Sequence, residues 1–179
     1  MEMNPCDPLQ DTHPPAANFF NPANHKDDHM VCIKQLYKQH NSGQGIQHLQ
    51  GADEAKEIFG EALCLLFAGA LLDMSYAFMD RQQGKQVLPP PFKIPSCRFV
   101  HAMIAVVHGD KDKTFLIEEF ITEPFSKYVG NAQPCAIPSS NKERNHLAEF
   151  CCFLQHVQYE KSSHMAFTSD FQGFTLFYL

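Results

Sequence analysis

The sequence predicts an α+β fold on the strength of three patterns. Residues 53–80 carry apolar side chains at the three- and four-residue spacing of a long helix. Residues 98–121 hold two apolar runs around a Gly-Asp turn, which is typical of a β-hairpin. An amphipathic helix is expected again after Ser140, with a short strand behind it. A chain of 179 residues with 44% hydrophobic residues is long enough to bury a core.

Composition argues against two classes of partner. The formal net charge of -6 lacks the basic footprint of a nucleic-acid-binding protein. The most apolar stretch, Ala62–Leu72, is too short to span a bilayer and is followed by Asp73, so we expect a buried helix and no membrane partner. Seven cysteines without a Cys-x-x-Cys pair indicate reduced thiols, and the N-terminus is polar and proline-broken. These features predict a cytoplasmic location.

Residues 1–29 are rich in proline and polar side chains, which predicts an irregular or disordered leader. His25 and His29 within it are expected to be solvated, because no further ligand completes a tetrahedral set nearby. A β-branched and aromatic strand is expected at 30–38, with Lys34 in its middle. Lys34 is either a lysine on a solvated strand face or a rigidly held charge that contacts nucleotide phosphates.

The long helix is expected to begin at Asp53 and Glu54, where acids complement the helix dipole, and to end at 82–84. One apolar stripe runs along it: Ile58, Ala62, Leu65, Gly69, Leu72, Tyr76 and Met79. Four further residues widen the stripe: Phe59, Leu63, Leu66 and Ala70. The middle of the helix is therefore expected to be buried nearly all round, with Glu54, Glu57 and Glu61 on its polar side.

The hairpin is expected to pair residues 98–107 with 114–121 across a turn at Gly109–Asp112. Its second strand ends in two acids, Glu118 and Glu119. Two interpretations remain open for them. They are either solvated charges at a strand exit, or carboxylates that bind an adenine or ribose edge.

Near the end of the chain, Ser140 and Glu143 have the spacing of a capping box, and Leu147, Phe150, Leu154 and Val157 mark the helix that follows. A strand at 164–168 is expected to lead into Asp170-Phe171-Gln172-Gly173. An acid and an amide two residues apart can aim two oxygen ligands at one Mg²⁺ ion. The alternative is an ordinary turn in which Asp caps the backbone and Gly supplies φ > 0.

Taken in order, several motifs resemble the catalytic domain of the alpha-kinases, atypical Ser/Thr protein kinases. The resemblance covers about residues 30–175. The motifs are Val31-x-Ile33-Lys34, Arg98-Phe99-Val100, Leu116-Ile117-Glu118-Glu119-Phe120-Ile121, Phe125-x-Lys127-Tyr128-x-x-Asn131, Gln155-His156-Val157-Gln158-Tyr159-Glu160 and Ser169-Asp170-x-Gln172-Gly173.

The resemblance implies a site for ATP and Mg²⁺. Lys34 corresponds to the lysine that contacts the ATP phosphates, and Glu118 to the hinge acid that holds the adenine. Gln172 corresponds to the amide ligand of Mg²⁺. Phosphoryl transfer needs charge neutralisation at the β- and γ-phosphate oxygens, which these groups would supply.

The resemblance also implies catalytic residues and a structural zinc ion. Asp170 corresponds to the catalytic aspartate, and Lys127 and Asn131 line the phosphate-transfer site. His156 corresponds to the first histidine of the family's zinc site, whose other ligands do not occur in the sequence. Gln172 is likewise not followed by the family's Thr-Asp-Pro, whose acid is the second protein ligand of Mg²⁺.

The implied fold is α+β, two-lobed and protein-kinase-like, shortened at both ends and with an incomplete C-lobe. Its expected parts are an N-lobe at about 30–117, a hinge at about 118–122 and a partial C-lobe at about 123–179. The implied function is ATP-dependent phosphorylation of Ser or Thr in a protein substrate. The alternative is an inactive kinase remnant that acts as a nucleotide-binding or protein-interaction module, and a zinc-binding regulator is a third hypothesis.

Overall fold

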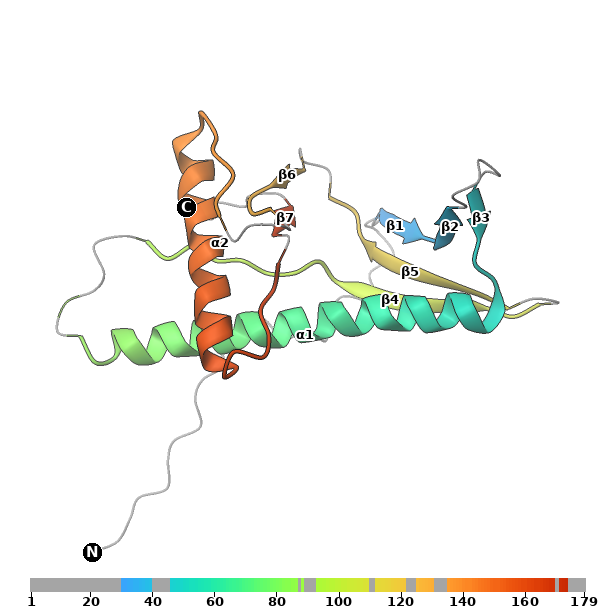
Figure 1. Ribbon diagram of the computed structural model, residues 1–179, viewed down its shortest axis with the longest axis horizontal. Coiled ribbons are helices and arrows are strands. Elements are labelled where there is room, and N and C mark those ends of the chain that lie inside the picture. The colour runs from blue at the N-terminus through green and yellow to red at the C-terminus, as the bar shows by residue number, and fades with distance from the viewer. Residues whose placement is uncertain are drawn as a thin grey trace, which may run out of the picture.

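The computed structural model describes residues 30–39, 46–86, 88, 93–109, 112–121, 125–130, 135–169 and 171–173. This part of the chain is a mixed α+β structure with two helices and three small antiparallel sheets (Figure 1). In chain order the elements are β1 (Val31–Lys34), β2 (Tyr37–Gln39), β3 (Ile46–His48), α1 (Gly51–Gln83), β4 (Ala102–Val107), β5 (Lys113–Glu119), β6 (Ser126–Lys127), α2 (Lys142–Lys161) and β7 (Gln172–Gly173). The expected leader at 1–29, with His25 and His29, lies outside the described residues.

The predicted hairpin is confirmed and forms two strands of the main sheet. β4 and β5 pair antiparallel from Ala102 opposite Glu118 to Val107 opposite Lys113, so the first strand begins four residues later than expected from Arg98. β1 adds to the other edge of β5, which gives the strand order β1-β5-β4. The long helix α1 packs against β5 and β4 and runs beneath the sheet in Figure 1.

The strand expected at 30–38 is broken into two. β1 pairs with β5, whereas β2 pairs with β3 in a separate ribbon. The break falls at Gln35 and Leu36, and the side chain of Gln35 turns to donate a 2.9 Å hydrogen bond to Oε1 of Glu54. The local pattern could not show this change of partner, because strand pairing depends on residues far away in the sequence.

Glu54 joins the start of α1 to the sheet and corrects one expectation. It is fully buried instead of lying on a solvated face. Its Oε2 atom accepts a 2.8 Å hydrogen bond from the backbone N–H of Thr114 on β5, while Oε1 accepts the hydrogen bond from Gln35. A buried carboxylate needs such partners, because burial without them is costly. The pair of contacts fixes the first turn of α1 against β5 and the break between β1 and β2.

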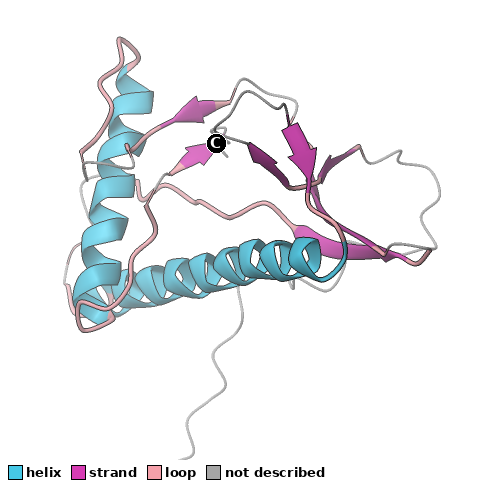
Figure 2. Cartoon of the chain, turned by 45° about the vertical axis from the view of Figure 1, so that its right-hand side comes forward, coloured by secondary structure: helices cyan, strands magenta, loops and turns pink. Residues whose placement is uncertain are grey.

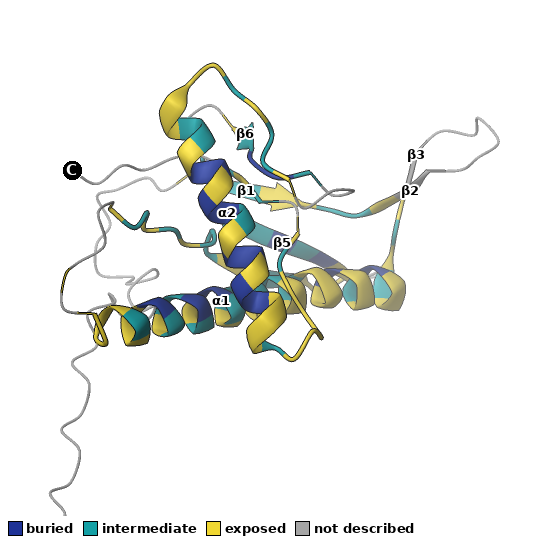
Figure 3. Cartoon of the chain, turned by 60° about the vertical axis from the view of Figure 1, so that its left-hand side comes forward, coloured by how far each residue is buried: buried dark blue, intermediate teal, exposed yellow. Residues whose placement is uncertain are grey.

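The helix predicted at 53–80 is confirmed as α1, but its burial differs from the expectation. The predicted stripe faces the protein, with Ile58, Leu72 and Met79 buried. The residues that were expected to widen the buried face are exposed instead: Phe59, Leu63, Leu66 and Ala70. The sheet and α2 pack along one side of α1, and the other side stays open in the described part of the chain (Figure 3).

The core lies where the second half of α1 meets α2. It includes Leu72 and Met79 from α1, and Leu147, Phe150 and Leu154 from α2. The predicted amphipathic face of α2 is therefore confirmed. Figure 2 shows the two helices crossing at a steep angle, so only one end of α1 contacts α2.

The cap of α2 corrects another expectation. Asn141, and not Ser140, is the N-cap residue, and its Oδ1 atom accepts a 3.0 Å hydrogen bond from the backbone N–H of Arg144. Asn145 also exchanges two hydrogen bonds with the backbone of Ser139. Asparagine caps helices as well as serine does, so the sequence pattern could not distinguish the two neighbouring positions.

A tyrosine ties the segment before the hairpin to α1. The Oη atom of Tyr76 donates a 2.8 Å hydrogen bond to the carbonyl oxygen of Pro95 and accepts one of 2.7 Å from the backbone N–H of Cys97. One side chain thus satisfies a backbone donor and a backbone acceptor that no strand pairs. The contact sets where the chain enters β4.

Candidate functional site

The first pair of predicted site residues meets on the main sheet. The Nζ atom of Lys34 on β1 lies 2.6 Å from Oε2 of Glu118 on β5, and their side chains are 47% and 12% exposed. Lys34 lies opposite Leu116 in the register, two residues from Glu118 on the same strand face. Leu116 is fully buried, so this is the face of the sheet that packs against α1. The sheet therefore holds an ammonium group against a largely buried carboxylate.

The neighbouring acid has a partner of its own. Both carboxylate oxygens of Glu119 accept 2.7 Å hydrogen bonds from the guanidinium of Arg98. Hydrogen bonding to Arg98 lowers the pKa of Glu119, since it favours the ionised carboxylate. Neither acid at the end of β5 is a simply solvated charge, and the two point to different cations. Glu119 holds the segment ahead of β4 in place.

The second pair of predicted site residues meets in the ribbon of β6 and β7. Lys127 is the register partner of Gln172, and Ser126 of Gly173. The ribbon is extended by a 2.9 Å hydrogen bond from the backbone N–H of Tyr128 to the carbonyl oxygen of Phe171. Figure 1 shows this ribbon between α2 and the main sheet. Asn131 and Asp170, the other predicted residues of the phosphate-transfer site, lie outside the described residues.

The ribbon is also fixed to α2. The Nη2 atom of Arg144 in the first turn of α2 donates a 3.0 Å hydrogen bond to the carbonyl oxygen of Lys127. On the other side, Phe171 stacks on Phe99 with 6.3 Å between the ring centroids. These contacts place the backbone of Lys127 between a helix start and the segment that enters the hairpin.

Two buried glutamines of α2 hold the segment that leads to Asp170. The Nε2 atom of Gln155 donates a 2.9 Å hydrogen bond to the carbonyl oxygen of Thr168, and the N–H of Thr168 donates one of 2.7 Å to Oε1 of Gln158. The strand expected at 164–168 is absent from this described segment, because its backbone pairs with side chains instead of a strand. The sequence reasoning missed this role. The pattern that could have indicated it is a pair of glutamines three residues apart on the apolar face of an amphipathic helix.

His156 lies between these glutamines on the exposed side of α2. Within the described ranges, no group of three His, Cys, Asp or Glu side chains is placed to hold a metal ion. The described residues therefore do not fit a zinc site at His156. Gln172 is different, since it is an exposed residue paired with Lys127 across the ribbon, and an amide oxygen suits a hard cation that also contacts phosphate.

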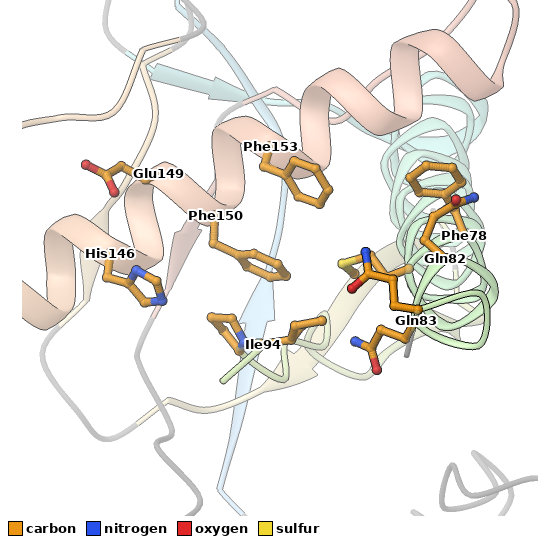
Figure 4. Close-up of a pocket in the computed structure, with 11 residues that line it drawn as sticks. Phe78, Gln82, Gln83, Ile94, His146, Glu149, Phe150 and Phe153 are labelled. Atoms are coloured by element: carbon orange, nitrogen blue, oxygen red, sulfur yellow. The ribbon is translucent and has the colours of Figure 1, made fainter. Parts of the chain in front are cut away.

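A cavity of about 450 Å³ lies apart from both pairs (Figure 4). It is formed between the end of α1, the start of α2 and the segment at Ile94, with Phe78, Phe150 and Phe153 among its lining residues. Its lining is mainly apolar, and none of the described predicted site residues belongs to it. The cavity does not suit a triphosphate, which needs cations and hydrogen-bond donors around it.

The chain as a whole matches a known class of enzyme. Comparison with protein families matches residues 16–179 to the alpha-kinase family, and the chain belongs to that family of Ser/Thr protein kinases. The match begins within the segment expected to be a leader. Neither the curated proteins nor the solved structures include a significant match to the chain. The family uses ATP, Mg²⁺ and a protein substrate.

Proposed function

We propose that this chain is an ATP-dependent protein Ser/Thr kinase of the alpha-kinase type, which transfers the γ-phosphate of ATP to a hydroxyl of a protein substrate. The observation that carries the proposal is the pairing of Lys127 with Gln172 in the β6–β7 ribbon. The lysine proposed to neutralise phosphate and the amide proposed to hold Mg²⁺ lie on paired strands, one before and one after the helix that holds the segment at Thr168.

The proposal gives each residue a separate task. Lys127 and Asn131 contact the transferred phosphoryl group, and Asp170 orients or deprotonates the acceptor hydroxyl. Gln172 holds Mg²⁺, which when bound neutralises charge on the β- and γ-phosphate oxygens. Gln155 and Gln158 act on the backbone of Thr168 and are therefore positioning residues for Asp170.

The contact between Lys34 and Glu118 bears on how ATP would bind. The adenine and the phosphates are opposite ends of ATP, so the two side chains cannot hold these two ends while they remain 2.6 Å apart. We propose that Lys34 contacts the phosphates and that Glu118 orients Lys34. Protein kinases of the common type use a comparable Lys–Glu ion pair beside the phosphates.

The proposed lobes follow the order of these elements. The main sheet and α1 would form the N-lobe at about 30–117, with the hinge at about 118–122. The β6–β7 ribbon and α2 would belong to the C-lobe at about 123–179. We also propose a cytoplasmic location, on the reduced cysteines.

The direct test is Mg²⁺-dependent transfer of radiolabelled phosphate from ATP by the purified chain, to itself and to a basic protein substrate. We expect Asp170→Ala and Lys127→Ala each to lower the rate by a hundredfold or more, on the order expected for loss of a group that stabilises the transition state. Lys142→Ala is the matched control, because Lys142 is an exposed lysine at the start of α2 without an assigned role.

Equal rates in all four proteins would reject the site assignment. A wild-type chain that binds ATP but transfers no phosphate would instead favour the alternative, an inactive nucleotide-binding or protein-interaction module. Phosphate transfer that persists without Mg²⁺ would reject the role of Gln172.

A further inference from the structure

The outward face of α1 carries large apolar side chains that the described part of the chain leaves uncovered. Phe59, Leu63, Leu66 and Phe67 are 57%, 50%, 70% and 61% exposed, and Ala70 is exposed beside them. Their spacing places Phe59, Leu63, Leu66 and Ala70 on one stripe of the helix. We call these four residues the outer stripe. Figure 3 shows the exposed side of α1 turned away from the sheet and α2.

Such a stripe calls for an apolar partner. Large contiguous apolar patches are uncommon on monomers and mark interaction surfaces. α1 is also long and apolar enough to cross a membrane by length and composition, and most of its apolar stretch is not buried. The opposite side of α1, however, packs against β4, β5 and α2, so this side of the helix is part of the folded domain. The partner must therefore lie against one face only.

The order of residues in the outer stripe suits a second copy of α1 running in the opposite direction. In an antiparallel pair with its two-fold axis at the middle of the stripe, Phe59 lies level with Ala70 of the second copy. Leu63 lies level with Leu66 of the second copy. A large side chain thus meets a small one at each end, and two leucines meet on each side of the axis, an arrangement that allows close helix packing.

Charges at the two ends of the stripe select the same arrangement. The same two-fold axis places Lys56 level with Asp73 of the second copy, once at each end of the paired helices. Both residues are exposed, and neither has an ion-pair partner within the described ranges. A parallel pair would instead place Lys56 beside Lys56, which is unfavourable. Charge complementarity therefore favours the antiparallel pair.

From this stripe and its flanking charges we propose that the chain forms a homodimer in which the outer stripe of α1 packs antiparallel against the same stripe of a second copy. The interface is isologous, since each copy contributes the same surface. It uses residues of α1 that contact neither the Lys34–Glu118 pair nor the β6–β7 ribbon. The proposal is therefore independent of the proposed kinase activity.

The association is measured by sedimentation velocity of the full chain over a range of concentrations. We expect a dimer, and a dissociation constant raised on the order of a hundredfold or more by Leu66→Glu, because two buried leucines become two carboxylates. Met165→Glu is the matched control: Met165 is 84% exposed and lies after α2. The circular dichroism spectrum of Leu66→Glu is expected to match the wild type, since Leu66 contributes little to the core.

The direction of the helices is tested by charge reversal. Lys56→Glu and Asp73→Lys are each expected to weaken the dimer about fivefold, as for two exposed ion pairs. The double variant is expected to restore wild-type affinity, because opposite charges then face each other again at both ends of the paired helices. Additive losses in the double variant would overturn the antiparallel arrangement.

The measurements give different results if the outer stripe contacts something other than a second copy of the chain. A wild-type chain that stays monomeric and floats with phosphatidylcholine vesicles would overturn the proposal in favour of a membrane surface. A monomeric chain that associates only after deletion of residues 1–29 would assign the outer stripe to that segment and would also overturn it.

Discussion

The backbone N–H of Thr168 donates a 2.7 Å hydrogen bond to Oε1 of Gln158, a fully buried side chain of α2. The carbonyl oxygen of the same residue accepts from Gln155. The segment that leads to Asp170 is therefore positioned by side chains of a helix and not by a neighbouring strand. Packing of α2 against α1 is thereby linked to the proposed catalytic aspartate.

We expect Gln158→Leu to lower the free energy of unfolding by about 1 kcal/mol, because it leaves the part-buried N–H of Thr168 without its partner. Urea denaturation measures this loss. Phosphate transfer at saturating ATP is expected to fall further than the folded fraction does, since the backbone before Asp170 loses its anchor. His156→Ala is the control, because this exposed neighbour is expected to change stability by less than about 0.5 kcal/mol. Equal stability of the two variants would contradict the assigned role of Gln158.

Glu54 gives a prediction about the main sheet. Glu54→Ala removes the partner of both Thr114 N–H and Gln35, so we expect a loss of about 2–3 kcal/mol in the free energy of unfolding. The exposed Glu57→Ala, one turn along α1, is the control and is expected to be nearly neutral. A loss of similar size for Glu57→Ala would show that helix charge, and not the buried contact, is responsible.

Glu119 predicts a dependence of stability on pH. Its pKa is held below the ordinary 4.5 by hydrogen bonding to Arg98. The carboxylate thus stays ionised in the folded chain at a pH where the unfolded chain binds a proton. The stabilisation by the contact between Glu119 and Arg98 is complete at pH values above the pKa of Glu119 in the unfolded chain. It is lost as the pH falls through the lowered pKa of the folded chain. We expect Glu119→Gln to cost about 1 kcal/mol near pH 7, and less as the pH falls toward about 3.

Urea denaturation of the wild type and of Glu119→Gln across that range provides the comparison. Glu61→Gln, an exposed acid on α1, controls for the general effect of one charge. A difference between wild type and Glu119→Gln that stays constant across the range would exclude the Arg98 contact as its source.

The Lys34–Glu118 pair predicts distinct effects on nucleotide binding. Lys34→Ala is expected to weaken binding of a fluorescent ATP analogue about tenfold through loss of a phosphate contact, whereas the exposed Lys113→Ala is expected to have no effect. Glu118→Gln frees the lysine. If Glu118 only orients Lys34, this variant binds ATP and GTP with unchanged relative affinity. A selective loss of ATP affinity would show that Glu118 contacts the adenine.

Local periodicity was sufficient to predict both helices and the β4–β5 hairpin, because each depends on residues close in sequence. It did not predict that β1 would end after Lys34, since the partner of β1 is β5, far along the chain. The contact between Lys34 and Glu118 follows from this distant pairing. The resemblance implies that both residues belong to one nucleotide site, but only the ion pair in the folded chain shows that they touch.

The sequence pattern also did not predict which apolar residues of α1 are buried. Hydropathy gives Leu66 and Leu72 the same weight, although one is exposed and the other buried. The difference depends on which side of the helix the sheet and α2 occupy, which is a tertiary property. In the same way, Gln155 and Gln158 are polar in sequence but buried in the fold, where each forms one hydrogen bond with the backbone of Thr168.

The hydrogen bonds of Tyr76 to the backbone of Pro95 and Cys97 allow the packing of this segment on α1 to be followed by tyrosine absorbance. The chain has five tyrosines and no tryptophan, so tyrosinate absorbance is undisturbed by indole. Burial is the main cause that raises the pKa of Tyr76, and its phenol resists ionisation at alkaline pH values that convert solvated phenols. A late step in a spectrophotometric titration would therefore mark the moment when the segment before the hairpin detaches from its helix.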